Sequence, residues 1–468
     1  MDGTPAASGA APAVVPLRAN REFRLLWVGQ ALSDFGTAMT SLVLPLVLLR
    51  SGYSTSATSV IGTAVLVTAM VLRMPAGYLT DHYSHRRLML VADLARLVTV
   101  GAVAVWTYLD RLPIAMAVIT VVVAQVGVEL FRPSQNATVR RVVPAVQLGT
   151  AISLNQARAY AAGIVAPAVA GLLIAASLWL PFAIDAATYA VSALCVLALY
   201  RPLRRAEAAR RADRDAGAGA GDGAGGTGER TPGGADPARE AEDCEEAVLA
   251  HMSGTGAKSE PRERFLPRLT AGLRYVVRNP FLRTIAGLAA GENFAFQALA
   301  YALLLGIGRE HDGATAVGLA MSAAAITGLT GSLIAPFLQR RLRMQTVMAS
   351  GPALAGVMLA VAWYTDSGIA FAAGYSALCL LTPVNGAVFG TILATTVPEN
   401  IYGRTTTALG FVAEILQPLG PLAAGLLLSY LSLSGTAALF ALAFALLAAL
   451  ALLMPSPPVT ADAKTAAA

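Results

Sequence analysis

Twelve apolar stretches, each about 20 to 28 residues long, divide this chain of 468 residues into two sets of six. A helix of about 20 apolar residues crosses the ~30 Å hydrocarbon core of a bilayer. Because lipid offers the backbone no hydrogen-bond partners, segments of this length must cross it as helices. Hydrophobic residues make up 56% of the chain and charged residues only 13%, far from the composition of a water-soluble domain. We therefore predict an all-α membrane protein with transmembrane helices at about 24–49, 56–80, 86–108, 113–133, 147–176, 180–200, 282–308, 314–338, 344–364, 369–396, 405–430 and 434–454.

The same pattern predicts two six-helix bundles, 21–201 and 264–455, with cytoplasmic tails at 1–20 and 456–468. Residues 202–263 between them are rich in Arg, Glu, Asp, Gly and Ala, and this composition cannot bury enough apolar area to fold. We expect a flexible cytoplasmic linker there. The segment FLPRLTAGLRYVV that follows mixes apolar and basic residues at helical spacing, which predicts either a short helix on the inner membrane surface or a simple extension of the seventh span.

Arginine is distributed very unequally between the two sides of the predicted membrane protein. One side carries the arginines before span 1, after spans 2, 4 and 8 and throughout the linker, whereas the other carries only Arg50, Arg111 and Arg309. Since loops rich in Lys and Arg stay in the cytoplasm, both termini and the linker are predicted to be cytoplasmic, in a multi-pass protein of the plasma membrane. The pI of about 9.4 expresses this asymmetry, so no nucleic-acid partner is expected, and a monomer in the lipid bilayer is the simplest assembly.

The two halves share residues in a constant register. Phe23, Gly29 and Asp34 in the first span match Phe281, Gly287 and Glu292 in the seventh, each pair 258 positions apart, and Pro144, Gly149, Pro167 and Gly171 match Pro398, Gly403, Pro421 and Gly425 at a spacing of 254. Prolines and an acid that keep one register favour duplication over chance. Parallel six-helix repeats are typical of transporters whose substrate site lies near the bilayer midplane, between the halves.

Carboxylates within predicted spans are the strongest candidates for function. A charged side chain near a helix centre costs at least ~2.5 kcal/mol, so such residues usually face a water-filled cavity or a partner. Asp34 and Glu292 occupy equivalent positions and should face each other across a central cavity, where a partly desolvated carboxylate can take up and release a proton. We predict proton coupling through Asp34 or Glu292. The alternatives are that they bind a cationic substrate, or that each acid only accepts hydrogen bonds from neighbouring helices and never titrates.

Other polar residues in the spans extend this candidate site. Arg158, beside Asn155 and Gln156, is expected to pair with Asp34 or Glu414, or else to hold an anionic substrate. Asp185 lies near the outer end of span 6, where a surface role is plausible. Phe294 and Phe296 are candidate apolar walls. From position on the helices, the predicted substrate-binding residues are Gln30, Asp34, Asn155, Arg158, Glu292, Asn293, Gln297 and Glu414.

The spans carry no pattern expected of an enzyme or a metalloprotein. The three cysteines and four histidines have neither metal-ligand nor nucleophile spacing, and no Gly-rich loop ends in Gly-Lys-Ser/Thr, so we expect no metal, no cofactor and no catalysis.

The loop between spans 2 and 3, GYLTDHYSHRRL, resembles the signature loop of the major facilitator superfamily. Gly77, Leu79, Asp81, Arg86 and Leu88 fit that pattern, whereas His82, Ser84 and His85 depart from it. The resemblance implies twelve helices in two bundles and a loop that clamps the cytoplasmic helix ends in the outward-open state. An ordinary turn with solvated charges is the alternative for these residues.

Two further segments resemble a helix-packing motif of the family's exporters: Gly163, Pro167 and Gly171 in span 5, and Gly420, Pro421 and Gly425 in span 11. Ala166 and Ala170 stand where the motif prefers Gly, so packing of small residues explains the pattern nearly as well.

NREFRLLWVGQ at the start of span 1 and GLRYVVRNP before span 7 are similar to the branch of drug and siderophore exporters that contains enterobactin exporters and macrolide efflux proteins. Span 4, however, has Gln125 and Gly127 but lacks the Arg of many proton-driven drug antiporters. The resemblance implies a secondary transporter that exports a small amphipathic or hydrophobic compound in exchange for protons. An importer or facilitator on the same fold, or a membrane sensor that signals through the linker, are the alternatives.

Overall fold

The computed structural model describes residues 16–219, 265–309, 313–397 and 399–454; some side chains within these ranges, including those of residues 77–78 and 81–82, lie outside the description. Twelve helical segments of the described chain are long and apolar enough to cross a membrane, which confirms the predicted fold class. The helices are α1 (Arg21–Arg50), α2 (Thr55–His82), α3 (His85–Tyr108), α4 (Ile114–Val142), α5 (Ala145–Ala176), α6 (Leu180–Gly219), α8 (Phe265–Arg278), α9 (Pro280–Gly308), α10 (Gly313–Arg341), α11 (Met344–Thr365), α12 (Gly368–Thr396), α13 (Glu399–Glu414), α14 (Leu419–Tyr430) and α15 (Leu433–Leu452).

Capping side chains define where several of these helices begin. The Asn20 side chain accepts hydrogen bonds from the backbone N–H groups of Glu22 and Phe23, and Asn279 does the same at the start of α9. Ser54 and Ser432 cap α2 and α15 in the same way. Each cap satisfies backbone donors that the first turn of a helix leaves without partners.

Six membrane spans of the described chain form each half, with α13 and α14 together making one span of the second half, and the same neighbours recur in both. In the first half α1 packs against α5 and α6, and α3 packs against α4 and α6; in the second half α9 packs against α14 and α15, and α11 packs against α12 and α15. This matching arrangement agrees with the register shared by the two halves of the sequence.

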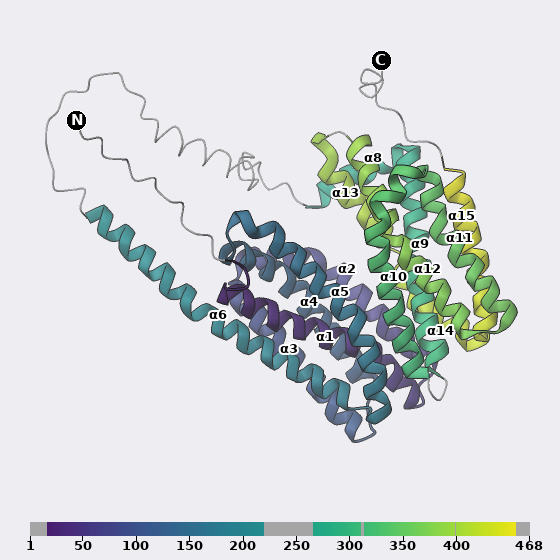
Figure 1. Cartoon of the computed structure of the whole chain (residues 1–468), viewed down its shortest axis with the longest axis horizontal. Coiled ribbons are helices and arrows are strands. Elements are labelled where there is room, and N and C mark those ends of the chain that lie inside the picture. The colour runs from purple at the N-terminus through teal and green to yellow at the C-terminus, as the bar shows by residue number, and fades with distance from the viewer. Residues whose placement is uncertain (1–15, 220–264, 310–312, 398, 455–468) are drawn as a thin grey trace, which may run out of the picture.

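The halves converge at one end of the molecule and diverge toward the end where the N-terminus of α1 and helix α8 lie (Figure 1). At the converging end, α2 contacts α14 and α5 contacts α10. The Thr55 hydroxyl donates to the Gly425 carbonyl over 3.1 Å, and the Thr315 hydroxyl donates to the Gly171 carbonyl over 3.3 Å. Both contacts join one half to the other near the loops α1–α2 and α9–α10, so this end of the central space is closed.

Two features differ from the expectations for single segments, and a third decides between two alternatives. Helix α6 continues to Gly219, past the boundary at 201, because its Arg, Ala and Glu residues favour helix; residues 220–263 of the expected linker lie outside the described residues, as do 1–15 and 456–468 of the tails. Helix α8 is not a simple extension of the seventh span, since the Asn279 cap begins a new helix and α8 packs against α13. The eleventh span is not continuous, because α13 ends at Glu414 and α14 begins at Leu419.

Candidate substrate cavity

A cavity of about 620 Å³ lies between the two halves and is lined by α1, α5, α9, α10 and α12. Its wall is mainly apolar and aromatic. The first half contributes Tyr160 and Pro167, and the second contributes Phe296, Tyr301 and Tyr375, with the Phe296 and Tyr375 rings 5.4 Å apart. A volume of this size suits a drug-sized molecule, and few polar groups interrupt the apolar surface. The cavity can therefore hold the apolar body of a small compound.

A second pocket of about 230 Å³ adjoins the cavity within the first half. Both are lined by Ala38, Ser41, Ala159 and Gly163, so these residues lie between the two spaces. We call it the first-half pocket; Gln30, Ser33, Asp34, Thr37, Arg96 and Arg132 supply its polar groups.

Asp34 in this pocket is neutralised by Arg158, so of the two partners expected for Arg158, Asp34 and Glu414, it is Asp34 that pairs with it. Arg158 Nε donates to Asp34 Oδ2 over 3.0 Å, and the two side chains are 8% and 25% exposed. Gln30 donates to the other carboxylate oxygen over 2.8 Å, and Asn155 accepts a hydrogen bond from Arg158 Nη1 over 3.2 Å. Four predicted site residues therefore form one hydrogen-bonded cluster: Gln30, Asp34, Asn155 and Arg158. Within it, Asp34 and Arg158 neutralise each other's charge.

A third pocket of about 200 Å³ adjoins the cavity on the other side, where Phe296 and Thr382 line both spaces. This second-half pocket contains the predicted residues Glu292, Asn293 and Gln297. No ion pair of the described residues reaches Glu292, and its Oε1 atom is buried without a hydrogen-bond partner. Asp34 and Glu292 thus flank the central cavity from opposite halves, but only Asp34 has a counter-charge.

Two of the predicted residues, Glu414 and Phe294, line none of these three spaces. Glu414 instead forms an ion pair with Arg73 of α2, across the two halves. Asn293 lines the second-half pocket, but its amide also donates to the Ala413 carbonyl over 3.0 Å. Phe296 forms a wall as predicted, whereas Phe294 is not among the residues that line the cavity, because it lies two positions away on α9.

The break between α13 and α14 borders the second-half pocket through Gln417. Pro418 has no backbone N–H to continue the helical ladder, and the break leaves carbonyl groups that need donors. The Thr63 hydroxyl of the first half donates to the Pro418 carbonyl over 2.9 Å, and Asn293 donates to Ala413. Side chains from both halves therefore complete the backbone hydrogen bonding at this point.

The predicted helix-packing residues lie mostly at close contacts. A Cβ atom on Gly171 would lie 3.0 Å from the Ala314 carbonyl oxygen, and one on Gly425 would lie 2.4 Å from Ser59 Oγ. Gly420 approaches the backbone of α9 as closely, while Pro421 is buried. Gly163 has no neighbour within 4 Å of such a position and lines the cavity instead.

The predicted signature loop is described only in part. Gly77, Leu79 and Asp81 belong to the last turns of α2, and Arg86 and Leu88 to the first turn of α3. The side chain of Asp81 lies outside the described residues, so its expected role in a clamp remains a prediction.

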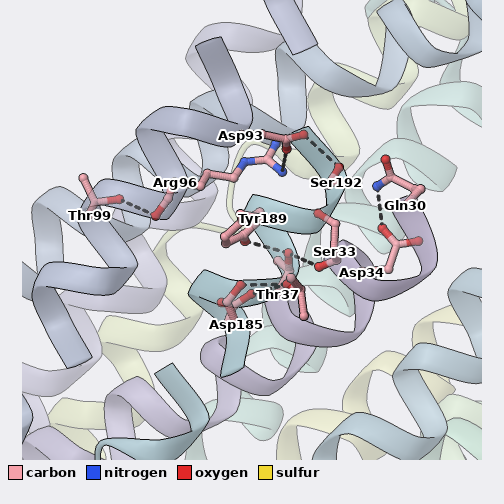
Figure 2. A network of polar contacts seen from close by, with 11 residues as sticks. Gln30, Ser33, Asp34, Thr37, Asp93, Arg96, Thr99, Asp185, Tyr189 and Ser192 are labelled. Carbon is pink, nitrogen blue, oxygen red and sulfur yellow. Dashed lines mark hydrogen bonds and ion pairs between the residues drawn. The ribbon is translucent and has the colours of Figure 1, made fainter. Parts of the chain in front are cut away.

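A buried polar network in the first half was not identified from the sequence (Figure 2). Arg96 of α3, 2% exposed, lies 3.9 Å from Asp93, and its guanidinium carbon lies 5.4 Å and 5.8 Å from the ring centres of Tyr189 and Phe131. Gly127 of α4 leaves room for it, since a Cβ there would lie 2.1 Å from Arg96 Nε. The sequence signal was an acid and a base one turn apart inside an apolar span.

Asp185, expected near the surface, is fully buried in the same network. Thr40 donates to Asp185 Oδ2 over 2.5 Å, and Thr188 donates to Oδ1 over 3.3 Å. Position near a helix end did not imply exposure, because α6 packs along α1 and α3 at this level.

Two six-helix halves around a central cavity, with polar pockets in each half, define a secondary transporter scaffold. The chain belongs to the Major Facilitator Superfamily, whose family model matches residues 26–415, so it is a multi-pass membrane transporter with a small-molecule substrate.

The curated relatives include drug exporters. The multidrug efflux pump Tap of Mycolicibacterium fortuitum is 24% identical over 438 residues, which cover 90% of this chain and 92% of that protein. Macrolide efflux protein A of Streptococcus pyogenes is 27% identical over 158 residues, 34% of this chain and 38% of that protein. These relatives confirm the resemblance to the drug-exporter branch.

Solved structures of transporters share the fold. The nucleoside transporter NupG (D323A mutant) is 12% identical with a TM-score of 0.66, and the match covers 93% of this chain and all of that one. A bacterial homologue of the iron transporter ferroportin, solved in an inward-facing state, is 14% identical with a TM-score of 0.62 over 93% of this chain and 97% of that one. At these identities the likeness shows the fold alone.

Proposed function

We propose that this transporter exports small amphipathic compounds across the plasma membrane and that proton uptake at Glu292 drives the export. The observation that carries the proposal is that the two carboxylates beside the cavity differ in their ion-pair partners. Asp34 is paired with Arg158, whereas Glu292 has no ion-pair partner among the described residues.

An unpaired carboxylate in a region of low dielectric is costly, because neither water nor a counter-charge compensates its negative charge. Such a group is stable there when it holds a proton or when a cation lies beside it. Glu292 can therefore exchange a proton for the cationic group of a substrate, and this exchange is the basis of antiport. The apolar wall beside it, which includes Phe296, would receive the rest of the molecule.

Orientation and the relatives support export as the direction of transport. The arginine-rich side of the chain is cytoplasmic under the positive-inside rule, which places both termini there. The halves diverge toward that side and meet at the other, so the cavity would receive substrate from the cytoplasm (Figure 1). The efflux activity named for the relatives supports export in particular.

Reconstituted vesicles test this proposal. Proteoliposomes with an acidic interior should accumulate a fluorescent cationic dye, and a protonophore should abolish the accumulation. Glu292→Gln should remove the part that depends on the proton gradient, while Glu129→Gln should not, because Glu129 accepts a hydrogen bond from Gln125 and lines none of the three spaces. Accumulation by Glu292→Gln that equals the wild type and still needs the gradient would refute the assignment.

A further inference from the structure

The buried network of the first half contains two carboxylates and one guanidinium, contributed by Asp93, Asp185 and Arg96. Asp93 and Asp185 are fully buried and Arg96 is 2% exposed. If all three were ionised, one negative charge would remain uncompensated within the bundle, at a cost of several kcal/mol. A single bound proton removes that imbalance.

The geometry distinguishes the two carboxylates. Asp93 lies one helical turn from Arg96, with Oδ1 3.9 Å from Nη1, and accepts a hydrogen bond from Ser192 over 2.8 Å. Asp185 has no ion-pair partner among the described residues, and its carboxylate accepts hydrogen bonds from the hydroxyl groups of Thr40 and Thr188. Arg96 lies within ion-pair distance of Asp93, although no hydrogen bond joins them, so Asp185 is the carboxylate of the two that lacks an ion-pair partner in the described part of the chain.

Helix α1 is shaped around this carboxyl group. A Cβ on Gly36 would lie 2.1 Å from Asp185 Oδ1, and Thr40 follows Gly36 one turn later. The intervening residue Ala38, and Ser41 next to Thr40, line the central cavity. One turn of α1 therefore contacts Asp185 on one face and the cavity on the other.

Hydroxyl groups connect this region with the first-half pocket. The Thr37 hydroxyl lies 2.8 Å from the Tyr189 hydroxyl, and Thr37 lines the pocket (Figure 2). Tyr189 lies one turn after Asp185 on α6. The titratable or charged groups that face Asp185 are Arg96 of α3 and Tyr189 of α6. Asp93 of α3 lies farther along α6, against Ser192, with Cys195 near it. Helix α1 faces Asp185 with Gly36, Thr37 and Thr40, which carry no charge.

We propose that Asp185 is a proton-binding site of the first half, separate from Glu292 in the second half, and that its protonation acts on the cavity through the Gly36–Thr40 turn of α1. Proton binding at Asp185 does not depend on what is transported. Its contribution to coupling rests on the proposed function, which would then move protons at two sites.

Infrared difference spectroscopy of the purified full-length protein, between acidic and alkaline buffer, tests the site without any substrate. The wild type should show a carboxylic-acid C=O component at acidic pH that moves on deuterium exchange and that Asp185→Asn lacks, separate from the component that Glu292→Gln removes. An indicator dye should show that the wild type takes up one proton more per molecule than Asp185→Asn. Difference spectra and proton uptake identical to the wild type would overturn the proposal.

A second variant keeps the test decisive if Asp185→Asn does not fold. Thr40→Val preserves the shape of the side chain but removes the hydroxyl next to Asp185, so the band should shift to higher wavenumber as the acid loses a hydrogen-bond partner. Glu292→Gln is the matched control and should leave this band in place. A band that Thr40→Val does not move would overturn the site, while loss of gradient-driven export in Glu292→Gln would still support the proposed function.

Discussion

The ion pair between Asp34 and Arg158 should stabilise the first half strongly, and its energy can be worked out from the geometry. Two unit charges 3.0 Å apart interact by about 5 kcal/mol at an effective dielectric constant of 20. Asp34 is 25% exposed, so solvent screening should lower the coupling to about 2–3 kcal/mol. This corresponds to a factor of roughly 30 to 150 in the folding equilibrium.

A double-mutant cycle measures this coupling. Asp34→Asn leaves the Arg158 guanidinium, 8% exposed, without its counter-charge, and Arg158→Gln leaves the Asp34 carboxylate without its partner. Each single variant should therefore lose more stability than a neutral change, and the double variant should recover about 2–3 kcal/mol relative to the sum of the singles. The readout is the free energy of unfolding in mixed micelles, followed by circular dichroism during denaturation with SDS. Additive single effects, within about 0.5 kcal/mol, would refute the reasoning.

Three other changes follow from close contacts. Gly425→Val should separate the halves at their closed end, because its Cβ would meet Ser59. Opening that end should close the α8 side, so a water-soluble maleimide added from the α8 side should label the cavity residue Cys379 more slowly; unchanged labelling would contradict this. Gly127→Ala should cost about 1–3 kcal/mol of unfolding free energy by displacing Arg96, whereas Gly101→Ala, with open space around it, should cost nothing in the same denaturation assay. Arg73→Glu should slow export with little loss of stability, since the exposed pair contributes less than about 1 kcal/mol, and adding Glu414→Arg should restore the rate; failure of this charge swap would exclude a role for the pair in movement of the halves.

The sequence was sufficient to predict the twelve spans, because length and apolar content determine whether a helix can cross a bilayer. The rarity of acids in such spans also led directly to Asp34 and Glu292. Asp185 was misjudged because its place along α6 says nothing about the neighbouring helix, and Gly36 of α1 is what makes room for it. The partner of Arg158 could only be narrowed to Asp34, Glu414 or an anionic substrate, since pairing depends on how α5 is turned toward its neighbouring helices.

The break between α13 and α14 was also predictable only in part. Gln417 and Pro418, followed by Gly420 and Pro421, are a readable signal for a break, but a long apolar run concealed it. The donors that complete the break, Thr63 and Asn293, come from other helices and could not be identified from the sequence.

That break also distinguishes the two halves. In the register that matches Pro167 with Pro421, the position of Pro418 in the second half corresponds to Ile164 in the first, and α5 runs through it without interruption. The two halves therefore differ at an equivalent place: the fifth span of the first half is one continuous helix, whereas its counterpart in the second half is interrupted before Leu419. Only the second half can bend at this position without first breaking helical hydrogen bonds.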